Sequence, residues 1–322
     1  MQKLASLMVV AVSIASVAVL GGCGGVGGLS GATGSDVSGV LPGALTGQAS
    51  GPEALTGKVA FVSTRGGNTW IYVMRADGAH LRALTTGPSG NVHPAWSPNG
   101  RRIAFVSDRT GNGDVYILDV ATLAVTQVTN TPEVETEPAW SPDGRRIAFA
   151  RFDSGPFDEH IYKIKTDGTS ESQLTIGPGS DHAPSWSPDG TRIAFAGERA
   201  TGWGIYTMTT TGADQTLISP PDVVDREPAW SPGGKEIAFA RDLVGPIKIF
   251  IMAEDGSGAR RLSHLSGNEL SPSWSPDGLT VVFESSRSGG GDLYAVDVAT
   301  GSHTRLTHSP SEDFEPACWG PH

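Results

Sequence analysis

"EPAWSPDGRRIAFA", residues 137–150, places a tryptophan before a proline-containing turn and then runs into alternating large and small apolar residues. Close copies of this string return along the chain, and their tryptophans mark a register. The marked positions, spaced 44, 46, 44, 44 and 45 residues apart, are Trp96, Trp140, Trp186, Trp230, Trp274 and Trp319. A constant period of this size is typical of a solenoid or a propeller.

Each copy of the repeat reads as four short strands. Five of the tryptophans are followed by SPNG, SPDG or SPGG, in which proline suits the second position of a β-turn and glycine the fourth. The strand after the turn carries a phenylalanine, a third strand carries tyrosine or phenylalanine, and a fourth ends before threonine or serine. Both faces of these strands are apolar or small, so each sheet needs cover on both sides, which radial packing of sheets supplies.

The two ends of the repeat array complement one another. The first copy begins near residue 58 without a tryptophan strand ahead of it, and "EPACWGPH", residues 315–322, reproduces the start of such a strand at the far end. The sequence therefore predicts an all-β fold, a closed six-bladed β-propeller of four-stranded antiparallel blades. In it the C-terminal strand completes the blade formed by residues 59–85.

The repeated pattern also carries a family resemblance. PxWSPDGxxIAFxSxR, followed by IYxM, DG and LT, resembles the β-propeller repeat of the TolB family over residues 58–322. The likeness is to the propeller of that family and does not extend to its N-terminal α/β domain. A short glycine-rich segment stands in that place in this chain.

The N-terminus has the layout of a secretory signal peptide. Lys3 precedes an uncharged, mostly apolar run over residues 4–20, and two glycines lead to Cys23. The run LGGC at residues 20–23 resembles the bacterial lipobox, which implies cleavage before Cys23 and lipidation of its thiol. An uncleaved membrane anchor is the alternative, although 17 residues are at the short limit for spanning a bilayer. We expect a signal peptide over 1–22, a flexible tether rich in glycine and serine over 23–57, and the propeller over 58–322.

Charge limits the classes of partner. Lysine and arginine total 23 against 34 aspartates and glutamates, a net charge of −11, which argues against non-specific nucleic-acid binding. With the lipobox, this composition predicts a monomeric, membrane-anchored lipoprotein outside the cytoplasm. The expected location is the periplasm or outer membrane, or the cell surface where there is a single membrane.

Candidate site residues gather at one end of the predicted ring, the top face, where the first strand of each blade begins and the second ends. The loops of this face vary, whereas the SPDG turns at the other end, the bottom face, are nearly uniform. Three residues before each strand proline stand Asn91, Glu135, Asp181, Asp225, Glu269 and Asp313. The second strands end with Arg65, Arg109, Arg151, Arg199, Arg241 and Arg287.

Two interpretations of these twelve residues stay open. Arginine and carboxylate at the same level of every blade favour a structural ring of charge-assisted hydrogen bonds. Acidic oxygens around a channel mouth could instead bind a ligand or a hard cation such as calcium. In the structural case no cofactor is expected.

Further candidates are single aromatic and histidine residues near the top face. Trp70 and Trp203 stand outside the tryptophan repeat, at the start of third strands, and exposed tryptophans suit contact with a protein or a sugar ring. His93 and His182 lie near the expected channel mouth.

No catalytic constellation is recognisable. The chain has no nucleophile-elbow domain and no HExxH pair. We therefore expect an envelope protein that binds another protein through its top face and channel mouth. The alternative is a propeller enzyme, or a protein that binds carbohydrate or peptide in its channel, possibly with a metal. The sequence alone does not identify the partner.

Overall fold

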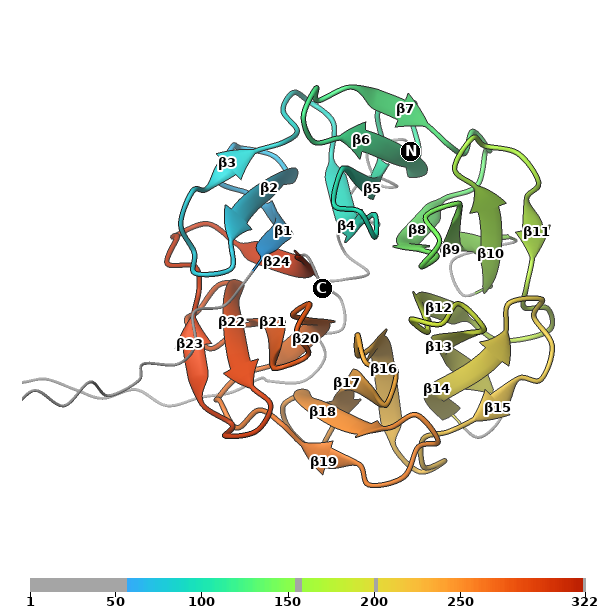
Figure 1. Ribbon diagram of the computed structural model, residues 1–322, viewed down its shortest axis with the longest axis vertical. Helices are drawn as coiled ribbons and strands as arrows, with labels where there is room; N and C mark the ends of the chain where they lie inside the picture. The colour runs from blue at the N-terminus through green and yellow to red at the C-terminus, as the bar shows by residue number, and fades with distance from the viewer. Residues whose placement is uncertain (1–56, 154–157, 200–201, 321–322) are drawn as a thin grey trace, which may run out of the picture.

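The computed structural model describes residues 57–153, 158–199 and 202–320. The predicted signal peptide, Cys23 and the tether up to residue 56 lie outside this range. Within it, 24 strands form six four-stranded antiparallel sheets that surround a central axis (Figure 1). The expected six-bladed propeller is confirmed. No helix in the described part of the chain is long and apolar enough to cross a bilayer.

Each blade runs from an inner strand beside the axis to a short strand at the rim (Figure 1). Blade 1 contains β24 (Asp313–Trp319), β1 (Lys58–Ser63), β2 (Trp70–Arg75) and β3 (Arg82–Ala83). Blade 2 contains β4 (Asn91–Trp96), β5 (Arg102–Ser107), β6 (Asp114–Asp119) and β7 (Val125–Gln127). Blade 3 contains β8 (Glu135–Trp140), β9 (Arg146–Phe152), β10 (Glu159–Lys165) and β11 (Ser172–Gln173).

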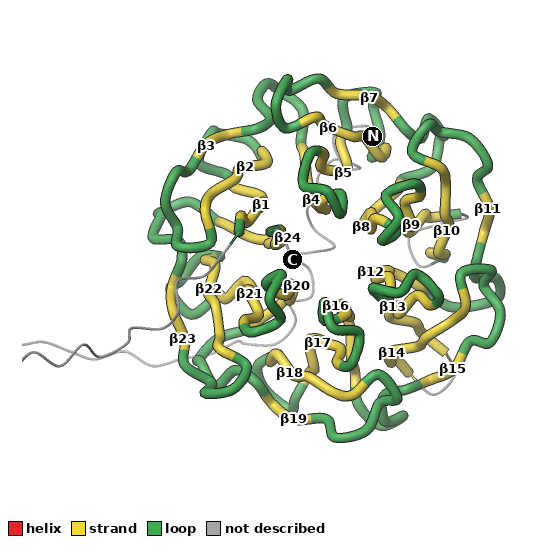
Figure 2. Tube along the Cα trace, viewed as in Figure 1, coloured by secondary structure: helices red, strands yellow, loops and turns green. Residues whose placement is uncertain are grey.

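The other three blades repeat this order, and loops carry the chain from the outer strand of one blade to the inner strand of the next (Figure 2). Blade 4 contains β12 (Asp181–Trp186), β13 (Arg192–Arg199), β14 (Gly202–Thr209) and β15 (Thr216–Leu217). Blade 5 contains β16 (Val224–Trp230), β17 (Glu236–Asp242), β18 (Lys248–Ala253) and β19 (Arg260–Arg261). Blade 6 contains β20 (Glu269–Trp274), β21 (Thr280–Ser285), β22 (Asp292–Asp297) and β23 (His303–Arg305).

The core lies between blades, where the large side chains of one sheet face the small side chains of the next. Ile147 and Phe149 of β9 pack with Ala104 of β5, and Ala148 and Ala150 pack with the following blade. These four residues of β9 are fully buried. Alternation of large and small residues along a strand is therefore what lets six similar sheets pack at a constant spacing.

At four of the five positions that hold the repeat tryptophan, the indole joins neighbouring blades by a hydrogen bond as well as by packing, and Nε1 of Trp230 is the exception. Nε1 of Trp140 donates to the carbonyl oxygen of Ala95 at 3.0 Å, and Nε1 of Trp274 donates to that of Ala229 at 3.0 Å. Each of these carbonyls belongs to the inner strand of the preceding blade. The indole thus satisfies its polar edge while its ring fills the interface.

Ring closure is also confirmed, because β24 pairs with β1 in an antiparallel ladder. The register corrects one expectation from the tryptophan spacing. Cys318 lies opposite Val59, as Trp96 lies opposite Ile103, so the cysteine occupies the position of the repeat tryptophan. Its thiol donates to the carbonyl oxygen of Ser273 at 3.7 Å, where other blades use an indole.

Trp319 stands one residue beyond this position and packs on the next blade instead. Its ring lies 5.7 Å from that of Trp96, and its Nε1 donates to the carbonyl oxygen of Pro98 at 3.1 Å. A side chain at Gly100 would meet the Trp319 ring at 2.0 Å, so only glycine leaves room for this contact. Trp319 therefore attaches the closing strand to blade 2 as well as to blade 1.

Replacing Trp140 by alanine tests the packing between blades. The variant removes a buried indole and its hydrogen bond to Ala95, so the free energy of unfolding should fall by about 3–5 kcal/mol. Urea unfolding followed by tryptophan fluorescence measures the change. An unchanged midpoint would contradict the structural role of the repeat tryptophan.

Candidate functional site

The acidic positions three residues before the strand prolines are buried inside the blades. All six are between 0% and 2% exposed, and none lines the channel cavity. In five blades the side chain accepts a hydrogen bond from the arginine of its own blade, at 2.6 to 3.0 Å. The pairs are Asp313 with Arg65, Asn91 with Arg109, Glu135 with Arg151, Asp181 with Arg199, and Asp225 with Arg241.

Blade 6 replaces the arginine by a lysine from another strand. Nζ of Lys248 in β18 lies 3.1 Å from Oε1 of Glu269 and also donates to two backbone carbonyls. Arg287, expected at this place, lies over the ring of Tyr294 at 5.6 Å. Lys248 and Glu269 are both buried, so each charge is neutralised by the other.

The paired arginines also stack on aromatic rings. Arg151 lies 4.5 Å from the ring centre of Tyr162, and Arg109 lies 4.6 Å from that of Tyr116. Each blade also holds its phenylalanine within about 6 Å of the third-strand ring, as Phe149 and Tyr162 show at 5.9 Å. In five blades these arginine pairs have the form that the structural interpretation predicts, whereas in blade 6 Lys248 takes the place of Arg287. Calcium binding at these positions stays a prediction.

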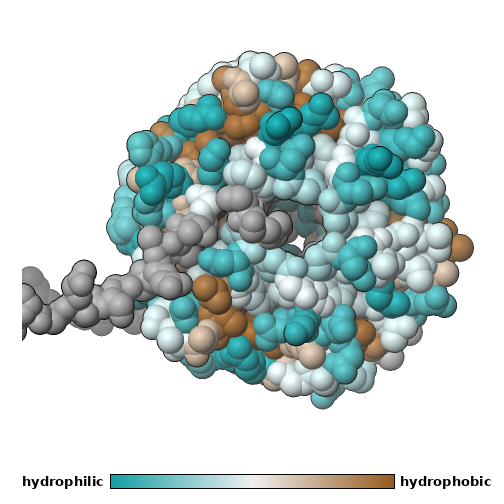
Figure 3. All heavy atoms as spheres, viewed as in Figure 1, coloured by the Kyte–Doolittle hydropathy of each residue, from teal (hydrophilic) through white to brown (hydrophobic). Residues whose placement is uncertain are grey.

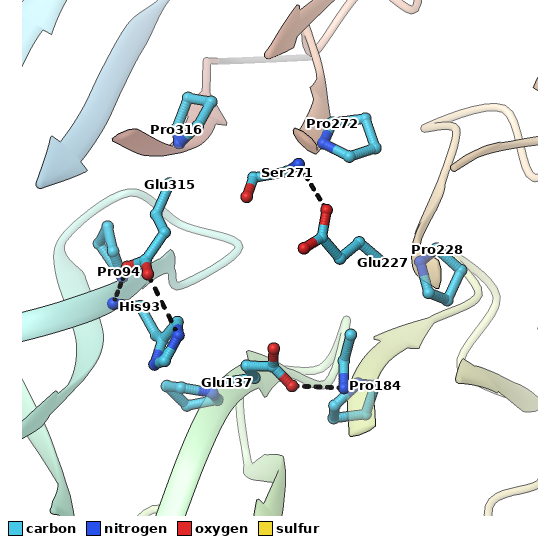
Figure 4. A pocket seen from close by; sticks show the side chains of 12 residues that line it. His93, Pro94, Glu137, Pro184, Glu227, Pro228, Ser271, Pro272, Glu315 and Pro316 are labelled. Carbon is cyan, nitrogen blue, oxygen red and sulfur yellow. Dashed lines mark hydrogen bonds and ion pairs between the residues drawn. The ribbon is translucent and has the colours of Figure 1, made fainter. Parts of the chain in front are cut away.

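The wall of the channel is built two residues further along each inner strand. The cavity there encloses about 160 Å³ and is lined by six prolines and the residues directly before them. Those preceding residues are His93, Glu137, Ala183, Glu227, Ser271 and Glu315. Figure 3 shows an opening at the centre of the ring, and Figure 4 shows side chains around the cavity.

All six channel residues have a left-handed backbone. Their φ angles lie between 50° and 54°, which is uncommon for residues other than glycine. In every blade the ladder between the first and second strands shifts register across this residue. The bulge redirects the side chain, which explains why the channel residue is not the one that simple alternation predicts.

Three glutamates stabilise this backbone from the preceding blade. The Oε2 atom of Glu137 accepts the N–H of Ala183 at 2.6 Å, and that of Glu227 accepts the N–H of Ser271 at 2.7 Å. Glu315 does the same for His93 at 2.6 Å (Figure 4). These bonds join blade 3 to 4, blade 5 to 6, and blade 1 to 2, so the channel has an approximate threefold pattern.

The remaining junctions use a serine hydroxyl where the sequence provides one. Ser185 Oγ accepts the N–H of Trp230 at 3.1 Å, and Ser273 Oγ accepts the N–H of Cys318 at 2.9 Å. At the junction of blades 2 and 3 the corresponding residue is Ala95. Blade 2 therefore departs from the alternation twice, with His93 in the channel and Ala95 behind it.

The four candidate residues near the top face lie in three places. His182 and Trp203 are brought together, with ring centres 5.0 Å apart in an edge-on contact. Trp70 lies in blade 1, where its Nε1 donates to the carbonyl oxygen of Gly87 at 3.0 Å. His93 lines the channel, and its Nε2 lies 3.2 Å from Oε1 of Glu315.

Charge compensation shifts the titration of His182. Burial alone would lower its pKa, but the carboxylate of Glu137, 3.5 Å from Nδ1, raises the pKa of His182 to about 9. Burial would likewise raise the pKa of Glu137, and His182 outweighs that effect, bringing it to about 2. The pair is therefore ionised at neutral pH, and the imidazolium of His182 balances the negative charge of Glu137 in the channel wall.

Two acids near the channel glutamates were not found from the sequence, namely Glu159, which is buried, and Glu284, which is partly buried. Burial raises the pKa of Glu159 to about 7, and its carboxylate accepts the hydroxyl of Thr136 at 2.8 Å. Burial, together with the nearby carboxylate of Glu227, raises the pKa of Glu284 to about 8. Among the described residues, no three His, Cys, Asp or Glu side chains are grouped so as to hold a metal ion.

A sequence signal for the channel glutamates was present. The residue before the strand proline is Glu in alternate copies, as in EPAW at 137–140 and 227–230 and EPAC at 315–318. The residues three positions before the proline form a more uniform sequence pattern, so the sequence predicts them as the channel residues. A strict alternation of side chains does not reveal the bulge that turns these residues away from the channel.

Known proteins share this repeat and this ring. A family model described as the TolB beta propeller domain matches residues 33–129, 112–225 and 218–321. The chain belongs to the TolB β-propeller family. The Tol-Pal system protein TolB of Geobacter sulfurreducens is 52% identical over 48 residues, which are 15% of this chain and 11% of that protein. The chain is thus aligned with only about a tenth of that relative.

Solved structures share this fold. The crystal structure of TolB from Acinetobacter baumannii gives a TM-score of 0.74 at 23% identity, covering 83% of this chain and 67% of the other. A putative TolB from Agrobacterium tumefaciens gives a TM-score of 0.66 at 22% identity, covering 78% and 88%. At these identities the likeness shows the fold.

Breaking one arginine pair tests the structural ring. Asp225 is fully buried and binds Arg241 through two bonds of 2.7 Å, so Asp225→Asn leaves a buried guanidinium without its counter-charge. The free energy of unfolding should fall by about 3–5 kcal/mol. The double variant Asp225→Leu with Arg241→Met removes both charges and should lose less, as urea unfolding would measure. Equal losses in the single and double variants would contradict the pairing.

Proposed function

We propose that this protein is a lipid-anchored module of the bacterial cell envelope that binds another protein through its top face and channel mouth. Membership of the TolB propeller family supports a binding role, because the Geobacter relative is named a Tol-Pal system protein. The signal-peptide and lipobox pattern around Cys23 supports the location. In this proposal the protein acts as a monomer and without catalysis.

The observation that carries the proposal is the exposure of large apolar side chains on the top face. Ile176, in the loop from β11 to β12, is 78% exposed, and Val244, in the loop from β17 to β18, is fully exposed. The His182 and Trp203 pair lies in blade 4. The first loop leads into this blade, and the second loop belongs to the neighbouring blade 5. Apolar and aromatic side chains on variable loops are typical of the centre of a protein interface.

The channel mouth complements this surface. Its three glutamates are held by backbone hydrogen bonds, so their carboxylates keep fixed positions. A fixed set of acceptors gives a partner a rigid polar target beside the apolar loops, and rigidity reduces the entropy lost on binding. The expected partner therefore combines apolar residues with hydrogen-bond donors or positive charge.

Surface variants at the two ends of the ring test the binding face. Ile176→Ser with Val244→Ser should weaken capture of the partner from envelope extracts by about tenfold or more, because both apolar contacts are lost. Leu123→Ser with Leu279→Ser is the control pair, since these leucines are exposed apolar residues, at 46% and 51%, on the bottom face. Cross-linking and mass spectrometry identify the partner. Equal capture by both variants would contradict a top-face site.

Metabolic labelling with a fatty acid tests the anchor. Wild-type protein should incorporate the label and sediment with membranes, whereas Cys23→Ser should do neither, because the thiol is the proposed acceptor. Cys318→Ser is the control that removes the other cysteine. Equal labelling of wild type and Cys23→Ser would contradict lipidation at this residue.

A further inference from the structure

The junction between blades 6, 1 and 2 departs from the repeat at two positions, one in the channel wall and one on the second strand of blade 6. His93 stands where the threefold pattern has Ala183 and Ser271. Glu284 stands directly after the blade phenylalanine, where the other five blades have alanine or valine. Because small residues fill these places elsewhere, packing of the blades does not require either ionisable side chain.

Both unusual residues contact the same residue of the closing strand. Oε2 of Glu284 accepts the backbone N–H of Glu315 at 3.0 Å. The carboxylate of Glu315 in turn accepts the backbone N–H of His93 at 2.6 Å and lies 3.2 Å from its Nε2. A continuous chain of contacts therefore crosses from β21 through β24 to β4, on both sides of the strand that closes the ring.

The surroundings of Glu284 favour its neutral form. On its own sheet it lies between Leu270 of β20 and Leu293 of β22. The charged groups that act on it most strongly from neighbouring elements are Glu227 of β16, Glu315 of β24 and Glu312 just before β24, and these three are acidic. Along this chain of contacts, the basic side chain that follows Glu315 is His93.

We propose that Glu284 is a proton-dependent latch for ring closure, which holds β24 when it is protonated and loosens β24 when it ionises. The neutral carboxyl still accepts the N–H of Glu315 but does not repel the surrounding carboxylates. After ionisation the same position carries a negative charge beside three others. Local separation of β24 from β21 would then give this charge access to water.

The direction of the pH effect follows from linkage. Burial and the neighbouring acids raise the pKa of Glu284 to about 8, whereas in an open strand it returns towards its ordinary value near 4.5. A group with a raised pKa in the closed state contributes stability at low pH, and this contribution is lost as pH rises through the closed-state pKa. The latch is therefore tight in acid and loose in mild alkali.

Hydrogen exchange of the full chain, followed by mass spectrometry of peptides, tests the latch. After correction for the intrinsic rate, protection of β24 and β1 should fall at least about tenfold between about pH 6 and pH 9. Peptides of β5 and β6 form an antiparallel pair in blade 2 that contains no histidine or glutamate, and they should change less. An equal fall in protection of both pairs of strands in the wild-type protein would overturn the proposal.

Two glutamine variants separate the latch from general titration of buried acids. Glu284→Gln keeps the acceptor for Glu315 but cannot ionise, so protection of β24 should become independent of pH over this range. Glu159→Gln is the matched control, since it removes another buried acid of raised pKa in blade 3 and should leave the fall at β24 intact. A wild-type fall that persists in Glu284→Gln would overturn the proposal.

A variant of His93 tests the second contact of the closing strand. His93→Ala keeps the backbone bond to Glu315, as Ala183 does with Glu137, and loses only the imidazole. Protection of β24 should fall at both pH values while the pH dependence remains, because Glu284 still titrates. Loss of the pH dependence in His93→Ala would assign it to the histidine and overturn the role of Glu284.

Discussion

The pairing of β24 with β1 is the constraint on which the rest of this structure depends. Every sheet is apolar on both faces, so no blade can end the array without exposing a core surface, and only a closed ring buries all of them. The other blades are built from consecutive strands, whereas blade 1 joins segments that are some 250 residues apart. Arg65 pairs with Asp313 across this junction, as the equivalent residues do in four other blades, and Trp319 adds a contact with Trp96 of blade 2.

Closure also creates the channel and determines its chemistry. Six inner strands bring six left-handed residues to one level, and three glutamates bind the backbone of the next blade. Backbone conformations of this kind are maintained only when surrounding bonds over-determine them, and they are often found at functional sites. The channel glutamates therefore serve the architecture while they present a polar surface to a partner.

Much of the fold was predictable, because its signals are repeated six times. The tryptophan and phenylalanine positions gave the blades, and the unmatched tail gave the closure. The arginine pairs were predictable in five blades, but Lys248 in place of Arg287 was not, since the lysine comes from another strand. The channel residues were missed because a bulge shifts the side-chain alternation. Trp319 is not the sixth repeat tryptophan that the spacing predicts, because Cys318 occupies that position and the tryptophan stands one residue later.

Cross-linking of the closing strand tests the central claim most directly. Cys318 lies opposite Val59, and its N–H donates to Ser273 instead of to β1, so the two residues form a non-hydrogen-bonded pair with close side chains. In a chain carrying Cys23→Ser, the substitution Val59→Cys should form a disulfide within one monomer under mild oxidation, detected by non-reducing electrophoresis and peptide mass. Free thiols, or a disulfide that joins two chains, would contradict a ring closed by its own C-terminal strand.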